Sequence, residues 1–162
     1  MSSMKARNPE PVMPANTEAE RVLLGAVLLD NAAYEQTTVL EACDFSLESH
    51  SRIYLRMGEL LDRDEAVDIV TLVEELRQLK ELESIGGAAY LCSLTEGLPR
   101  RPSVKDYVRI VKAKSLLRQL IGVCSSAIEK AYNGESGFDT ISTLREHLDE
   151  IEQSARRGVR KI

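Results

Sequence analysis

Histidine and cysteine side chains are the first candidates for chemistry, because they bind metals and act as bases or nucleophiles. The sequence has Cys43, His50, Cys92, Cys124 and His147, and no two of them have the short spacing of paired metal ligands. A di-iron helical site needs Glu-x-x-His, but leucine stands three residues before each histidine. No G-x-S-x-G turn for a nucleophilic serine is present. The pattern therefore favours buried thiols and ordinary histidines over a metal or catalytic site.

Nucleotide phosphates are usually held by a G-x-x-x-x-G-K-[ST] loop, and this chain has no glycine followed by lysine. The pair Gly86-Gly87 resembles a phosphate cradle only superficially, since it lacks the lysine, and a helix entry that needs small residues explains it better. We therefore predict that this chain has no catalytic, cofactor-binding or metal-binding residue and is not an enzyme by itself.

Basic residues gather between positions 100 and 118. They suit a solvated face paired with acidic neighbours such as Asp106, an acidic partner surface, or contact with DNA. The net charge of −5 and the pI of about 5.2 disfavour tight non-specific DNA binding. The residues that we predict as partner or DNA contacts are Arg100, Arg101, Lys105, Arg109 and Lys112.

The composition is that of a soluble globular domain, with 43% hydrophobic residues in 162 positions. Three widely spaced cysteines indicate reduced thiols, which favours a cytoplasmic location. No apolar run is long enough to span a membrane, so no membrane association is expected. Residues 1–15 lack the apolar core of a signal peptide and contain Pro9, Pro11 and Pro14, which predicts a flexible N-terminal arm.

Apolar periodicity predicts an all-α fold that begins with a compact head of five to six short helices over residues 16–99. A capping box of Thr17 and Glu20 starts the first helix, whose wide apolar stripe makes it central. The second helix covers Ala32 to Ala42, and the fifth Ala88 to about Thr95. Further caps are expected at Ser49 for the third helix, with His50 in its first turn, and at Asp68 for the fourth.

A long helical hairpin is predicted over residues 103–157, followed by the start of a linker at 158–162. Ser103 caps a helix that runs to about Tyr132, and the turn Asn133–Gly137 leads into the last helix. A short loop between two such helices predicts an antiparallel hairpin. The first helix has two adjacent apolar rows, whereas the second has a single seam at heptad spacing.

This mismatch leaves one apolar row of the hairpin uncovered, and an exposed row of that length favours self-association. The alternative is that the extra row packs on the head. The candidate self-association residues are Tyr107, Ile110, Leu116, Leu117, Leu120, Ile121, Val123, Cys124, Ile128, Ile141, Leu144, Leu148 and Ile151.

Six short phrases occur in a specific order along the chain. They are NTEAERVLLGAVLLD at 16–30, DF at 44–45, SHSRIY at 49–54, VDIVTL at 67–72, IGGAAYL at 85–91 and YVRIV at 107–111. In this order and spacing they resemble the N-terminal domain of DnaB-type replicative DNA helicases. The resemblance covers roughly residues 14–157. The segment Pro99–Pro102 departs from it by carrying two arginines where smaller polar residues are expected.

The resemblance implies a non-catalytic collar domain in DNA replication. Hairpins of this family pair subunits into dimers, three dimers form a collar above a ring of six ATPase domains, and the collar receives the C-terminal domain of primase and, in some bacteria, a helicase loader. ATP and Mg would belong to the ATPase domain of the parent helicase, and DNA would be contacted only weakly or through the full ring. The chain ends where the family enters its linker, so we expect a truncated helicase or a free-standing relative. The alternative is a free-standing helical nucleic-acid-binding or adapter protein.

Overall fold

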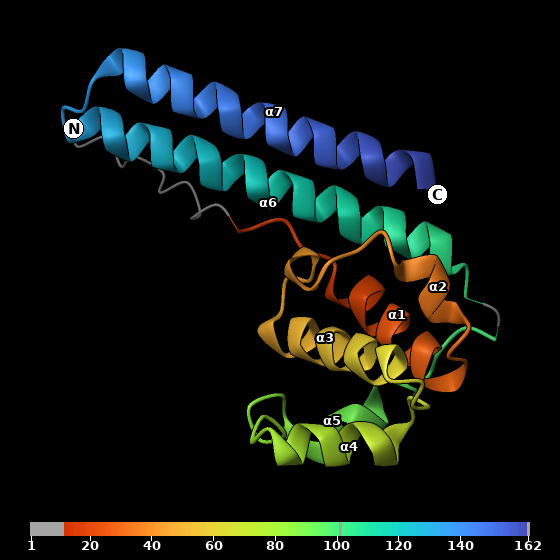
Figure 1. Cartoon of the computed structure of the whole chain (residues 1–162). Coiled ribbons are helices and arrows are strands. Elements are labelled where there is room, and N and C mark those ends of the chain that lie inside the picture. Colours follow the sequence, from red (N-terminus) through yellow and green to blue (C-terminus); the bar gives the residue numbers. More distant parts are fainter. Residues whose placement is uncertain (1–11, 101, 162) are drawn as a thin grey trace, which may run out of the picture.

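The computed structural model describes residues 12–100 and 102–161, with side chains as far as Arg156, and these ranges contain helices and no strand. A head of short helices is followed by a long antiparallel hairpin (Figure 1), which confirms the predicted all-α class. The elements are α1 (Thr17–Leu29), α2 (Ala33–Thr37), the 3-10 turn η1 (Ala42–Asp44), α3 (Glu48–Asp62), α4 (Ile69–Gln78), α5 (Gly87–Ser93), α6 (Val104–Tyr132) and α7 (Gly137–Lys161). Residues 1–11 of the predicted arm lie outside the described ranges.

Helix α1 is the centre of the head, as its wide apolar stripe predicts. Residues 19–28 are all buried except Arg21, and they pack against α2, α3 and α6. Gly25 allows close packing at this centre, because a Cβ there would lie only 2.2 Å from the carbonyl oxygen of Leu94, just after α5. The first helix therefore contacts α2, α3 and α6 directly, and it meets the end of α5 at Gly25.

The predicted capping box of α1 is wrong. Asn16 is the N-cap, and its side-chain oxygen accepts a hydrogen bond of 2.9 Å from the backbone N–H of Ala19. Glu20 does not return to the helix start, because its carboxylate is buried and accepts hydrogen bonds from Ser46 and His50. A capping box satisfies only local donors, whereas these partners come from distant segments that the fold brings to Glu20.

The second predicted helix is shorter than expected. It ends at Thr37 instead of Ala42, and η1 follows as a separate turn. The run Thr37-Thr38-Val39 is β-branched and weakens a helix, and the Tyr54 hydroxyl donates a hydrogen bond of 3.0 Å to the Thr37 carbonyl oxygen. The same carbonyl oxygen accepts a hydrogen bond of 2.7 Å from the backbone N–H of Leu40, so a tight turn follows the end of α2.

The starts of α3, α4 and α5 differ in whether a local side chain caps the helix. Asp68 caps α4, because it accepts hydrogen bonds from the backbone N–H groups of Val70 and Thr71, as predicted. Ser49 does not cap α3, because the N-cap is Leu47, two residues earlier, and its side chain makes no capping hydrogen bond. Gly86 enters α5 at φ +102, a conformation that suits glycine.

Helix α6 extends far beyond the head. Its buried residues are Val104, Val108, Val111 and Ser115, which all lie in its first half. Helix α7 packs against it in the antiparallel direction (Figure 1). It continues to Lys161, into the segment 158–162 where we predicted a linker to begin. The second half of the hairpin is therefore covered by little besides its own two helices.

Candidate self-association surface on the hairpin

The two apolar rows of α6 have different surroundings. Val123 and Ala127 are half-buried and lie with Leu144 along the seam between α6 and α7. The second row, which we name the outer stripe, consists of Leu117, Ile121, Cys124 and Ile128. Its members are exposed, with 44% of Leu117, 40% of Ile121 and 57% of Ile128 accessible to solvent. The seam therefore partly covers Val123 and Ala127 of one row, whereas the whole outer stripe stays exposed.

Some of the remaining candidate residues are exposed like the outer stripe, whereas others pack within the chain. Leu116, Leu120, Ile141 and Leu148 are exposed, while Ile151 is half-buried on α7. Tyr107 and Ile110 behave differently, because they are half-buried and pack against the core of the head. These two residues thus serve the contact between head and hairpin within one chain.

Two aromatic residues beside the hairpin turn are also exposed, and they were not predicted from the sequence. Tyr132 is the last residue of α6 and Phe138 is the second residue of α7, and both are more than four-fifths exposed. The sequence feature that could have identified them is their position on either side of the turn Asn133–Ser136. A single copy of the chain offers few side chains to cover them there. Moving an apolar side chain from water into a packed contact contributes about 1.5–3 kcal/mol to the free energy of association. These exposed side chains therefore favour burial against a partner surface.

The predicted basic cluster is not a single surface. Arg100 and Lys105 are exposed, and Arg109 pairs with Asp106 at 3.2 Å, while Arg101 lies outside the described ranges. Lys112 contacts the buried carboxylate of Asp44 at 2.8 Å. Lys112 therefore fastens α6 to η1, and this partner lies 68 residues away, where local spacing gives no signal.

Arg118 completes this connection. Its guanidinium donates hydrogen bonds to the backbone carbonyl oxygens of Pro14 and Asp44. Two basic side chains of α6 thus bind the η1 segment, and Arg118 also holds the chain just before α1. The angle between hairpin and head is set by these polar contacts together with the apolar packing of Val104, Val108 and Val111.

A buried polar network in the head was also missed. The Nδ1 atom of His50 lies 2.7 Å from a Glu20 oxygen, and its Nε2 atom lies 2.6 Å from the Tyr90 hydroxyl. Burial opposes ionisation of Glu20, but hydrogen bonds from His50 and Ser46 outweigh it and lower the pKa of Glu20. Burial raises the pKa of the Tyr90 hydroxyl. The network connects α1, α3 and α5.

The cysteines correct another expectation. Cys43, Cys92 and Cys124 are all exposed rather than buried. Over the residues that the structure describes, no three His, Cys, Asp or Glu side chains gather as metal ligands would. In the same ranges, no helix combines the length and apolar character that crossing a membrane requires.

Comparison with known proteins agrees with this architecture. The family model described as "DnaB-like helicase N terminal domain" matches residues 12–113. The replicative helicases DnaB of Geobacillus stearothermophilus and Treponema pallidum are 39% and 35% identical over 82% and 93% of this chain. These matches cover 29% and 35% of the relatives, so the chain spans about a third of the length of the curated relatives it matches.

Two solved structures have the same fold. The N-terminal domain of DnaB helicase from Mycobacterium tuberculosis has a TM-score of 0.78 and 28% identity, and the match covers 85% of this chain and 99% of that one. A DnaB-like replicative helicase, whose structure was described with its interactions with primase, has a TM-score of 0.68 and 25% identity over 84% of this chain and 31% of that one. The chain belongs to the family of DnaB-like helicase N-terminal domains.

Proposed function

We propose that this chain is the collar domain of a replicative DNA helicase, and that it joins subunits through the hairpin. The outer stripe carries this proposal, because it is an apolar surface beyond the reach of the head. Two copies that bury this stripe against each other would form the dimer, and three dimers would form the collar of a hexamer in the bacterial cytoplasm. Unwinding of DNA with ATP and Mg would then belong to the rest of the parent protein.

The test is the oligomeric state of the purified chain. We expect a dimer by sedimentation velocity, and we expect Leu117→Asp with Leu120→Asp to give monomers, because each carboxylate would lose water in the interface. The matched control is Leu55→Asp on α3, which is 44% exposed and lies in the head. All variants should keep the circular dichroism of a helical protein. A dimer that survives the hairpin substitutions but is lost in the control would place the contact in the head.

The same domain is proposed to recruit primase. The support is the family membership and the related helicase that was described with its interactions with primase. We expect the C-terminal helical domain of the cognate primase to bind the chain in isothermal titration calorimetry. No heat of binding at high micromolar concentration, with the dimer intact, would contradict recruitment by this domain alone. A helicase loader is a further proposed partner and is tested in the same way.

A further inference from the structure

The hairpin has a cavity on the face of α6 that is turned away from the outer stripe. It has a volume of about 160 Å³ and lies between the second half of α6 and the first half of α7. Ser126, which lines it, follows Leu117 of the outer stripe by nine residues, or about two and a half helical turns, so the two residues lie on opposite sides of α6. The lining residues are Gly122, Val123, Ser126, Ala127, Lys130, Thr140, Thr143, Leu144 and His147.

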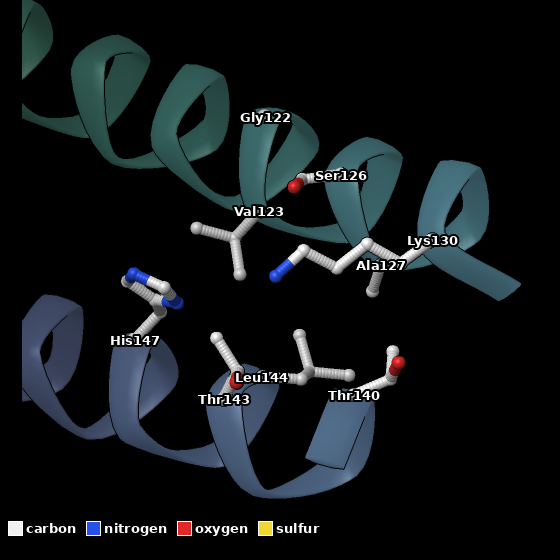
Figure 2. A pocket seen from close by; sticks show the side chains of 9 residues that line it. All are labelled: Gly122, Val123, Ser126, Ala127, Lys130, Thr140, Thr143, Leu144 and His147. Carbon is white, nitrogen blue, oxygen red and sulfur yellow. The ribbon is translucent and has the colours of Figure 1, made fainter. Parts of the chain in front are cut away.

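Hydrogen-bond donors enter this cavity from both helices. Figure 2 shows the Lys130 ammonium, which belongs to α6, directed back into the space between the helices, and the His147 ring, which belongs to α7, directed toward α6. An ammonium has three N–H donors and no acceptor, and an imidazole ring has at least one N–H in its neutral and in its protonated form. A ligand with several acceptor atoms could therefore bind both helices at once.

The positive charge of Lys130 has no partner among the described residues. Lys112 on the same helix pairs with Asp44, and Arg118 donates hydrogen bonds to backbone carbonyl oxygens. Lys130 is also half-buried, but within the described ranges its ammonium makes neither an ion pair nor a hydrogen bond. A charged group that has lost part of its hydration favours an opposite charge beside it, so an anion is the complement of this cavity.

The lining of the cavity also lacks the carboxylates that would repel an anion. None of its nine residues is acidic. The contrast is with the rest of α7, whose carboxylates before position 157 are Asp139, Glu146, Asp149, Glu150 and Glu152. An anion in the cavity would therefore meet the charge of Lys130 with no carboxylate in the same wall.

The size of the cavity and the type of cation favour a small tetrahedral oxyanion. The volume equals that of about five water molecules at about 30 Å³ each, which suits inorganic phosphate and is too small to enclose a nucleotide. Lysine binds phosphate as a point charge, whereas the planar fork of arginine is the better match for a carboxylate. We propose that the cavity binds a free phosphate ion between Lys130 and His147. The bound ion would hold α6 and α7 together near the hairpin turn.

The test is a titration of the isotope-enriched chain with sodium phosphate, with sodium chloride keeping the ionic strength constant. The amide signals of Ser126 and Thr143 should shift along saturable curves in the millimolar range. Lys130→Met keeps the aliphatic stem and should weaken phosphate binding at least tenfold, because the charge is lost. Lys105→Met removes an exposed cation of the same helix outside the cavity and should leave the affinity unchanged. Phosphate should raise the melting temperature of the wild type but not that of Lys130→Met.

Three outcomes would overturn the proposal. Signals that do not move, or that move equally when chloride replaces phosphate, would mean that no phosphate site exists. Equal affinities of the wild type and Lys130→Met would mean that the ion does not bind this ammonium. Phosphate binding that occurs only in the monomeric variant Leu117→Asp with Leu120→Asp would assign the cavity to the contact between copies. The dimer itself is measured separately by sedimentation, so its absence would leave the phosphate site intact.

Discussion

Buried polar residues connect distant segments of the head, and Glu20 is one of them. Its carboxylate is only 1% exposed, and its pKa lies below the usual 4.5 because the hydrogen bonds from His50 and Ser46 outweigh burial. A lowered folded-state pKa stabilises the fold above pH 4.5, and this contribution is lost as the pH falls through the folded pKa. We expect Glu20→Gln to lower the free energy of unfolding at pH 7 by about 1–3 kcal/mol.

The pH dependence of the free energy of unfolding distinguishes the charge of Glu20 from the packing of its side chain. In urea unfolding at pH 7, 5, 4 and 3, the difference between wild type and Glu20→Gln should shrink toward the acidic end. Glu18 and Glu81 also have lowered pKa values, through Arg21 and Arg56, but they are present in both proteins and cancel in the difference. A difference that stays constant from pH 7 to pH 3 would show that the charge of Glu20 contributes nothing.

Asp44 is a second buried carboxylate, and Lys112 is the cation that pairs with it. One of its oxygens binds Lys112 and the Glu41 backbone N–H, while the other has no protein partner among the described residues. Lys112→Met keeps the aliphatic stem but leaves this charge unpaired, so we expect a loss of about 1–3 kcal/mol in urea unfolding. Lys105→Met is the exposed control on the same helix. Equal stabilities of the two variants would contradict the role of the pair.

At the scale of elements, two helical glycines have opposite surroundings. A Cβ at Gly25 would lie 2.2 Å from the Leu94 carbonyl oxygen, whereas a Cβ at Gly122 meets nothing within 4 Å. We expect Gly25→Ala to lower the melting temperature because the end of α5 must move away from α1. Gly122→Ala should raise stability by up to about 1 kcal/mol, since alanine favours a helix. Destabilisation by Gly122→Ala would mean that this face already has a close partner in solution.

We expect the exposed cations at the start of α6 to determine how strongly the chain binds DNA. Lys112 and Arg118 are held within the fold, which leaves Arg100 and Lys105 as the exposed cations of the described cluster that have no ion pair. We expect single-stranded DNA to bind more weakly than about 10⁻⁴ M at physiological salt in fluorescence anisotropy. Micromolar binding that falls steeply with salt and is lost in Arg100→Glu with Lys105→Glu would instead favour the alternative of a nucleic-acid-binding protein.

At the scale of the whole molecule, assembly and stability should be linked. Burial of the outer stripe in a dimer stabilises only the folded chain, so the melting temperature should rise with protein concentration. The variant Leu117→Asp with Leu120→Asp should melt at one temperature at all concentrations, because it has no partner to lose. A wild-type melting temperature that does not depend on concentration would contradict the dimer, whatever the fold of the hairpin.

The sequence by itself determined the helices, the hairpin and the family, because these follow from apolar periodicity, turn residues and the order of short phrases. Local contacts such as the Asp68 cap were predictable for the same reason. Only the tertiary structure decided the partners of Glu20, Lys112 and Arg118, since their partners lie 26 to 104 residues away. It also decided which apolar row of α6 stays in water, because that depends on where the head stops covering the helix.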